Sequence, residues 1–379
     1  LLDYEAPLAA LWPAFGAHGK HRITIAQPLA HMAGVPGFIE PIDPDLWLDP
    51  KACADAIAAL EPLWPPGSAS GYHPMTWGYI AGEIVMRAAE RSLGTMLRED
   101  ICTPLGIDFQ IGTPESEHAR AAEMKKPSQA GDFGEITPPR KAAFFSRWAA
   151  PVRGSTQWRK VEIPSANGHG TALGVARLYE LYATGGLIGG ARVLSQEGFD
   201  AMTKRRWKGD DLVLPFNVDW RTGIIGNSNR IYGPSPEAFG HSGAGGSVGF
   251  GDPVAGVSAG YVVNKQSHYI MGDPRSLKLT NSLYSCLLGA ACSPSARSPS
   301  PWRSSRHCFS CCRKLTACCL RTASRCSAIT SRSGAPGAPR LRGTPRACTT
   351  QTFCLAIIKP PCLASPMSLR SIRRRRFCC

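Results

Sequence analysis

The sequence predicts an α+β fold in which helices come first and an antiparallel sheet is completed late in the chain. Apolar residues recur at three- and four-residue spacing over 75–89, which is typical of an amphipathic helix. Residues 239–265 are rich in Gly, Val and Phe, with an apolar run at 257–263 and a turn at Asp252-Pro253, a pattern that favours consecutive strands. Because helices precede this hairpin and do not alternate with strands, the order argues against βαβ winding.

Local signals support the individual helices. Pro104 with Gly106 stops the helix 94–101, because neither residue continues a helix. Ser195, which precedes Gln196 and Glu197, has the position of a helix N-cap. In chain order the predicted helices cover 55–60, 75–89, 94–101, 171–184, a helix opening at Ser195, and 276–288.

Charge and cysteine content divide the chain into two kinds of sequence. The formal net charge is +15, from 43 Lys+Arg against 28 Asp+Glu, but no acidic residue follows Asp273 and residues 289–379 hold 17 of the basic ones. The rest of the chain has 26 basic and 28 acidic residues, a net charge of −2, and only 3 of the 15 cysteines. We therefore expect a folded body, residues 1–288, and an irregular tail, residues 289–379, that is disordered or non-native.

The same division excludes several broad classes of protein. A body with balanced charge is not expected to bind nucleic acid, and cysteines confined to the tail do not make a disulfide-rich secreted scaffold. No run approaches 18 apolar residues, so no membrane-spanning helix is predicted. The first residues lack the layout of a signal peptide, which favours a cytoplasmic location without establishing it. Oligomeric state is not indicated.

The tail allows several interpretations. Cys308 and Cys311 form a lone C-x-x-C without a second pair at zinc-site spacing, so no metal site is predicted. The cysteines could pair as disulfides, and the arginine run 373–376 could bind nucleic acid or act as a nuclear signal. The absence of acidic residues with Ser, Arg, Cys and Pro enrichment favours a frameshift or retained intron in GC-rich coding DNA.

Three segments of the body carry a resemblance. They are ITIAQPLAHMAGVP at 23–36, WPPG at 64–67 leading to GYHP at 71–74, and FGHSGAGGS at 239–247 followed by YVVN at 261–264. In this order they resemble the β-lactamase-related serine hydrolases, which include class C β-lactamases, penicillin-binding proteins and family VIII carboxylesterases. The esterase-like branch is the nearest.

The resemblance covers about residues 1–288 and implies a fold and a mechanism. The implied fold is an antiparallel sheet flanked by helices, with an additional helical region. The implied reaction is acyl transfer from a small ester or lactam, without metal or organic cofactor, through the serine of an S-x-x-K motif. A serine hydroxyl needs a base to become a nucleophile, and the developing oxyanion needs N–H donors aimed at it beforehand.

By position, Tyr72 matches the family's proton-transferring tyrosine, and Pro74 stands where the motif often has Asn. No serine of this chain is followed three residues later by lysine, so the nucleophile motif is missing. In the family that motif precedes the segment that matches residues 1–4. We therefore expect a chain that begins after its nucleophile, lacks the N-terminal strands and is inactive by itself.

The third motif supplies the remaining candidates. His241, Ser242 and Gly243 match the family's K-T-G or H-x-G strand edge, and the backbone N–H of Ala244 is the implied oxyanion donor. Histidine in place of lysine makes any cation there weaker and dependent on pH, which favours neutral esters over penicillin carboxylates.

Two alternative functions remain open. The chain could be a non-catalytic binding or scaffold protein of the same fold. It could also be an esterase of the α/β-hydrolase type with Ser247 as nucleophile, because Gly245-Gly246-Ser247-Val248-Gly249 fits G-x-S-x-G. That motif must lie between a strand and a helix, whereas the residues after Ser247 are typical of a strand and a turn.

Overall fold

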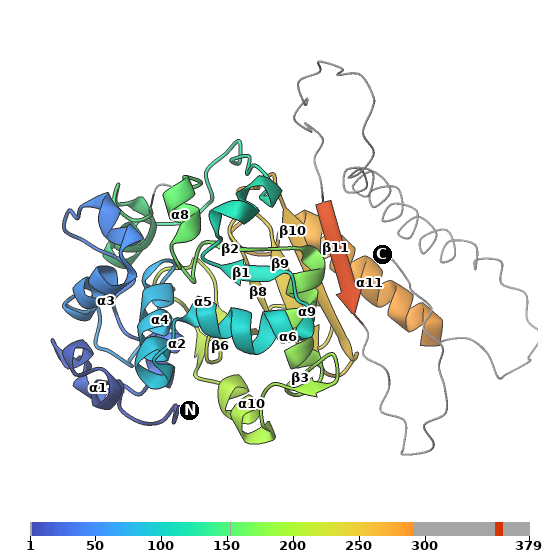
Figure 1. Cartoon of the computed structure of the whole chain (residues 1–379), viewed down its shortest axis with the longest axis horizontal. Helices are drawn as coiled ribbons and strands as arrows, with labels where there is room; N and C mark the ends of the chain where they lie inside the picture. Colours follow the sequence, from blue (N-terminus) through green and yellow to red (C-terminus); the bar gives the residue numbers. More distant parts are fainter. Residues whose placement is uncertain (1, 152, 292–352, 359–379) are drawn as a thin grey trace, which may run out of the picture.

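The computed structural model describes residues 2–151, 153–291 and 353–358. A helical region formed by the first part of the chain lies beside an antiparallel sheet formed by the later part (Figure 1). The helices are α1 Leu8–Leu11, α2 Ala26–Leu29, α3 Pro50–Ala58, α4 Thr76–Ala89, α5 Leu93–Met96, α6 Thr103–Leu105, α7 Pro138–Arg140, α8 Thr156–Lys160, α9 Ala172–Ala183, α10 Gln196–Thr203 and α11 Pro274–Ala291.

The main sheet has seven strands in the order β11-β10-β9-β8-β7-β6-β5, and every neighbouring pair is antiparallel. Two small two-stranded sheets, β1-β2 and β3-β4, accompany it. The strands are β1 Phe109–Ile111, β2 Gly168–Gly170, β3 Leu187–Ile188, β4 Ala191–Arg192, β5 Trp207–Gly209, β6 Val218–Trp220, β7 Ile225–Gly226, β8 Phe239–Ser242, β9 Val248–Asp252, β10 Val257–Val263 and β11 Phe353–Ile358.

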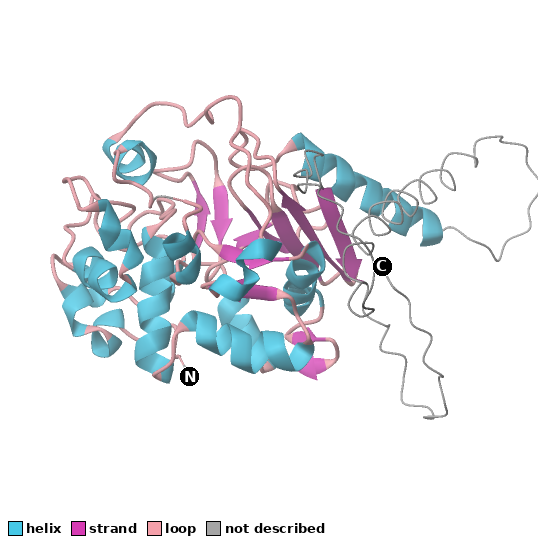
Figure 2. Ribbon diagram, turned by 45° about the horizontal axis from the view of Figure 1, so that its top comes forward, coloured by secondary structure: helices cyan, strands magenta, loops and turns pink. Residues whose placement is uncertain are grey.

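The alternating sequence of β9 explains how two helices cover the sheet. Successive side chains of a strand point to opposite faces, so Gly249 and Gly251 share one face and Val248 and Phe250 share the other. A Cβ atom on Gly249 would lie 2.2 Å from the Tyr179 ring of α9, so only glycine lets that helix approach. Helix α11 lies on the opposite face, and the two layers of helix enclose the sheet (Figure 2).

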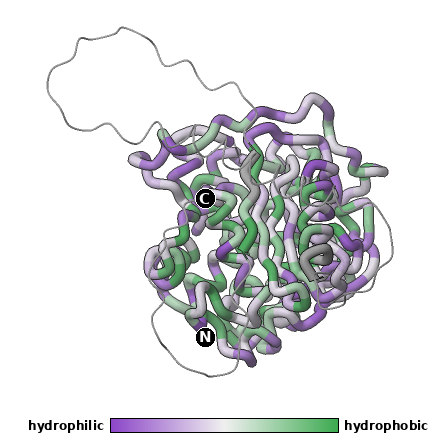
Figure 3. Tube along the Cα trace, turned by 90° about the vertical axis from the view of Figure 1, so that its right-hand side faces the viewer, coloured by the Kyte–Doolittle hydropathy of each residue, from purple (hydrophilic) through white to green (hydrophobic). Residues whose placement is uncertain are grey.

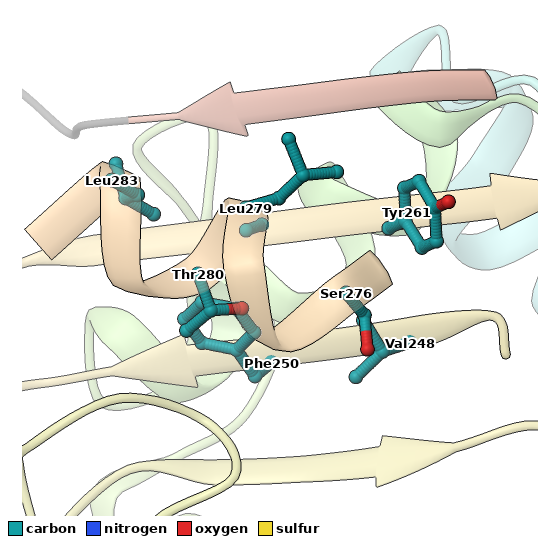
Figure 4. A pocket seen from close by; sticks show the side chains of 8 residues that line it. Val248, Phe250, Tyr261, Ser276, Leu279, Thr280 and Leu283 are labelled. Carbon is teal, nitrogen blue, oxygen red and sulfur yellow. The ribbon is translucent and has the colours of Figure 1, made fainter. Parts of the chain in front are cut away.

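Between α11 and the sheet lies a small cavity, lined by side chains from both (Figure 4). Its lining residues are Val248, Phe250, Ala259, Tyr261, Ser276, Leu279, Thr280 and Leu283. His241 pairs with Gly249, and directly opposed residues of an antiparallel pair share a face. The imidazole of His241 is therefore on the α9 face, and the cavity belongs to the core under α11.

In the described part of the chain three buried clusters form the core: one in the helical region, one between the sheet and α11, and a small one of Cys102, Ile107 and Ile188. Apolar residues follow the central strands, and more hydrophilic segments lie toward the periphery (Figure 3). Tyr72 packs against the sheet cluster, whereas Trp77, at the start of α4, packs against the helical cluster. The loop that carries Tyr72 thus lies where the two halves of the molecule meet.

The structure confirms the α+β class and most of the predicted elements. Ser195 caps α10, accepting a hydrogen bond of 3.0 Å from the Gly198 N–H. The predicted helix 55–60 begins earlier, at Pro50, because the Asp49 side chain caps it. The helix expected over 276–288 spans Pro274–Ala291, and the one expected over 94–101 is split into α5, a π-helical segment Leu97–Cys102 and α6.

The expectation of an irregular tail is wrong at β11. Its residues Phe353–Ile358 pair with β10 over six positions, from Val263↔Phe353 to Ser258↔Ile358. The backbone N–H and C=O groups of these six largely apolar residues form hydrogen bonds with the open edge of the sheet. The polar residues around this run dominate the composition of the tail, so composition alone did not indicate a strand. The C-x-x-C at Cys308 and Cys311 and the arginine run 373–376 lie outside the described residues.

Candidate functional site

Tyr72 lies in the loop that leads into α4, with its ring enclosed by other aromatic rings. It stacks on Trp220 of β6 at a centroid distance of 5.9 Å and an interplanar angle of 6°. The imidazole of His31 meets it edge-on at 4.9 Å, and Phe144 lies 6.4 Å away. This enclosure leaves the phenol few ways to move.

His241, from the far end of the sequence, lies beside Tyr72. Its ring centroid is 6.2 Å from that of Tyr72 and 6.0 Å from that of Trp220. Strand β8 positions His241 by pairing with β9, and β7 fixes the other edge of β8. The sequence prediction had assigned these two residues to one site, and the structure brings their rings together.

The hairpin between β8 and β9 carries the other candidates. The Gly243 N–H donates to the Ser247 carbonyl at 2.7 Å, and the Gly246 N–H donates to the Gly243 carbonyl at 3.1 Å. Ala244 lies between Gly243 and Gly246 in this turn and is exposed to solvent. Within the described part of the chain the Ala244 N–H donates to no protein acceptor. Ser242 is the last residue of β8 and pairs with Val248.

The turn of this hairpin is fixed from outside the strands. The Gly245 carbonyl accepts hydrogen bonds from the Ser267 N–H at 2.9 Å and from the Arg275 guanidinium at 2.8 Å. Arg275 also forms an ion pair of 2.7 Å with Asp273. Gly245 has φ +90°, a conformation that favours glycine. The N–H of Ala244 is therefore held in a rigid turn.

Ser247 does not have the surroundings of an α/β-hydrolase nucleophile. Strand β9 begins at the next residue, Val248, and the sheet around it is antiparallel. A nucleophile elbow requires a turn from a strand into a helix. The local structure thus agrees with the interpretation of this G-x-S-x-G as a coincidence of a Gly-rich hairpin.

The electrostatics favour neutral groups throughout the site. Burial, followed by the negative charge of Asp211, raises the pKa of Tyr72 to about 12, and the Arg153 guanidinium acts in the opposite direction. Burial also lowers the pKa of His241, and it lowers that of His31 well below the usual value. At neutral pH the site therefore has a protonated phenol and uncharged imidazoles.

The hydrogen bonds of His31 and His73 determine which ring nitrogen carries the proton in each neutral imidazole. The His31 Nδ1 accepts the His73 N–H at 3.1 Å, which requires that the ring proton of neutral His31 be on Nε2. His73 is fully buried and uses both ring nitrogens: Nδ1–H donates to the Gly71 carbonyl at 2.5 Å and Nε2 accepts the Val35 N–H at 3.1 Å. Burial lowers the pKa of His73 to about 3. His73 therefore has a structural role: its ring connects the backbone at Val35 to the backbone at Gly71.

Sequence reasoning missed three residues that contact Tyr72. His31 lies in the first quoted motif but is not among the site candidates, and Trp220 and Asp211 lie in none of the three motifs. Asp211 is buried and accepts the Tyr72 N–H at 2.8 Å, although 139 positions separate them. No local pattern marks Asp211 or Trp220, whereas His31 belongs to the motif at 23–36.

Comparison with known proteins identifies the family. The Beta-lactamase family model matches residues 1–279, so the chain belongs to the Beta-lactamase family. The chain is 32% identical over 281 residues to the esterase/beta-lactamase LipL of Mycobacterium tuberculosis, a match that covers 70% of this chain and 64% of LipL. The chain thus spans less than two thirds of that relative.

Two solved structures agree with this assignment. A penicillin-binding protein homologue from Caulobacter crescentus is 49% identical, with a TM-score of 0.73 over 75% of this chain and 76% of its own. A family VIII carboxylesterase is 37% identical, with a TM-score of 0.70 over 75% of this chain and 77% of its own. The fold is therefore that of the β-lactamase-related, esterase-like serine hydrolases.

The described residues contain no cluster of three or more His, Cys, Asp or Glu side chains arranged to hold a metal ion. Among the same residues, no helix has both the length and the apolar character that a membrane span requires.

Proposed function

We propose that this chain carries the acid–base and oxyanion half of an esterase site that works through an acyl-enzyme on neutral esters. The observation that supports this most directly is the proximity of the Tyr72 and His241 rings, with Ala244 three residues after His241 in the turn that follows β8. In the proposed reaction the lysine of an S-x-x-K motif accepts the serine proton as the serine oxygen attacks the ester carbonyl, and the Ala244 N–H stabilises the oxyanion. Tyr72 then donates its proton to the departing alkoxide and regains a proton from that lysine.

The protonation state of Tyr72 fits this role. A phenol with a pKa of about 12 holds its proton at neutral pH and can donate it to an alkoxide, which is the stronger base. It can accept the serine proton only when a cation stabilises the phenolate. The lysine of an S-x-x-K motif would supply that cation, and this sequence contains no such motif.

The surroundings also favour an uncharged, apolar substrate. His241 is neutral because its pKa is lowered, so it offers no fixed charge to a substrate carboxylate. Phe133, Phe144 and Phe145 form an aromatic cluster next to Tyr72, with centroids 4.5 Å apart for Phe133 and Phe144 and 5.2 Å apart for Phe133 and Phe145. Phe145 is 44% exposed and could contact an apolar acyl or alcohol group.

The test compares the chain alone with the chain preceded by a family segment that contains S-x-x-K. We expect hydrolysis of simple alkyl esters, followed by acid release, only by the fused protein, with a fluorophosphonate label on the added serine. Tyr72→Phe should lower turnover roughly 100-fold or more, as expected for loss of a general acid. Tyr269→Phe, at an exposed tyrosine, is the matched control.

Three results would overturn the proposal. Turnover by the unfused chain that disappears in Ser247→Ala would make Ser247 the nucleophile. Equal turnover with and without the Tyr72 hydroxyl would remove Tyr72 from the mechanism. A folded fusion protein that binds an ester analogue but is never labelled would favour the non-catalytic binding protein.

A further inference from the structure

One buried carboxylate connects the segments that surround Tyr72. The Asp211 Oδ1 accepts three backbone hydrogen bonds, from the N–H groups of Tyr72 at 2.8 Å, Val213 at 2.9 Å and Leu214 at 2.8 Å. Only 6% of Asp211 is exposed. A single oxygen thus holds the Tyr72 backbone against a loop that lies far away in sequence.

The second oxygen of Asp211 extends this arrangement to the sheet. Its Oδ2 accepts the Ser70 hydroxyl at 2.9 Å and the Trp220 indole N–H at 3.4 Å. Ser70 and Asp211 also form a β-bridge, in which the Leu212 N–H donates to the Ser70 carbonyl at 2.9 Å. The loop before Tyr72, the loop after Asp211 and strand β6 therefore meet at one carboxylate.

Both constraints act on the same side chain. The backbone of Tyr72 is bound by Oδ1, and the face of its ring lies on Trp220, whose indole is bound by Oδ2. We propose that Asp211 is a positioning residue, which sets where the Tyr72 hydroxyl lies by holding its backbone and its stacking partner together. The functional meaning of this role rests on the proposed part of Tyr72 in proton transfer.

The charge of Asp211 has a second consequence. Burial contributes most to the raised pKa of Tyr72, and the negative charge of Asp211 adds to it. Arg153 opposes that effect, while the rings of His31 and His241 that face Tyr72 are uncharged at neutral pH. Asp211 thereby favours the protonated phenol, the form that can act as an acid.

The test uses the full chain and needs no turnover. The nine tyrosines are labelled with ¹³C at the ζ carbon, and Tyr72 is assigned by its loss in Tyr72→Phe. Asp211→Asn keeps an oxygen for the three backbone donors but removes the charge. We expect the acid dissociation constant of Tyr72 to rise about threefold or more, because one unit charge is lost from a partly shielded site. Because the Asn amide NH2 that replaces Oδ2 cannot accept the Trp220 indole N–H, the ring-current shift from Trp220 should fall.

Asp211→Ala should have a different effect. It removes the shared acceptor, so the amides of Tyr72, Val213 and Leu214 should exchange with solvent together and at least roughly tenfold faster. Should this variant not fold, Ser70→Ala provides a second test, because it removes one link and should speed exchange of the Tyr72 amide several-fold. If the Tyr72 amide exchanges at the wild-type rate in folded Asp211→Ala, or in Ser70→Ala where that variant replaces it, the proposal is overturned.

The matched control is Asp219→Asn, at a buried carboxylate of the same strand as Trp220 that pairs instead with Arg205 and Arg221. It should leave the dissociation constant of Tyr72 unchanged. An equal shift in both variants, or none in Asp211→Asn, would show that Asp211 does not act on Tyr72. Because these measurements follow Tyr72 directly, they would stand even if the fused protein failed to hydrolyse esters.

Discussion

The buried histidines make the stability of this protein depend on pH, and His73 gives the sharpest case. Its folded-state pKa is about 3, below the ordinary value of 6.5 that applies when the chain is unfolded. The unfolded state therefore binds a proton below pH 6.5 that the folded state does not. The contribution of His73 is present in full above pH 6.5 and is lost as the pH falls from there toward 3.

The size of the effect follows from this difference in pKa. Over that range one proton difference costs about 1.4 kcal/mol per pH unit, so His73 alone removes about 2 kcal/mol between pH 7 and pH 5. His31, whose pKa is also lowered well below 6.5 by burial, acts in the same direction. We therefore expect the free energy of unfolding to fall by at least about 2 kcal/mol over the same interval, with His31 adding to the loss.

Urea unfolding at pH 7, 6 and 5 measures this dependence. His73→Gln should lower stability at pH 7, because glutamine cannot reproduce both hydrogen bonds of the ring, but its stability should fall less steeply with acid. His21→Gln, at an exposed histidine, is the control and should keep the wild-type slope. NMR of the His73 ring in the wild-type protein gives an independent readout: it should remain neutral at pH 5, with its proton on Nδ1. A stability that is flat between pH 7 and 5, or a His73→Gln protein with the wild-type slope, would refute the reasoning.

Three further changes test other parts of the fold. Tyr284→Phe removes the hydroxyl that donates to the buried Asp252 carboxylate at 2.5 Å, and should lower the free energy of unfolding by about 1.5–3 kcal/mol in urea titrations. Gly106→Ala should lower the free energy of unfolding by about 1 kcal/mol, because Gly106 has φ +62° but an added Cβ would meet no atom within 4 Å. Gly260→Ala should lower it by more, because its Cβ would lie 2.4 Å from a backbone carbonyl oxygen of α9. Arg140→Met, which removes guanidinium bonds of 3.0 and 3.3 Å to two carbonyls, should speed proteolysis of residues 121–150 at least severalfold.

Each of these predictions has a clear contrary result. Stability of Tyr284→Phe within about 0.5 kcal/mol of the wild type would mean that the carboxylate finds another donor. Equal costs at Gly260 and Gly106 would mean that α9 can move away from the sheet. Unchanged proteolysis of Arg140→Met would mean that residues 121–150 are held by other contacts.

The sequence predicted the elements whose causes are local. The N-cap at Ser195 needs only a side-chain oxygen three residues before a backbone N–H, and the structure has that bond. The late hairpin was recognised because Asp252 forms a turn, accepting the N–H groups of Val254 and Ala255. Helix α3 was predicted too short because its N-cap, Asp49, lies outside the apolar periodic stretch that was used to find it.

Strand β11 could not be predicted in the same way. Its residues form a short apolar run, and a run of that length becomes a strand only when a neighbouring strand offers unpaired backbone groups. Strand β10 offers that edge, yet Val263 and Phe353, which pair, are far apart in the chain. Composition averaged over residues 289–379 therefore gave the wrong expectation for 353–358.

Sequence motifs also could not predict the protonation states of the candidate site. Tyr72 and His241 were predicted because they lie in motifs, but a motif does not show what sets the protonation state of its residues. The pKa of Tyr72 depends on burial and on the opposed charges of Asp211 and Arg153, neither of which lies near it in sequence. A sequence comparison can therefore nominate the acid, whereas the burial and the charge that raise its pKa are found only in the folded arrangement. For this reason the charge at Asp211, more than the identity of Tyr72, is the sharper test of how the site would transfer a proton.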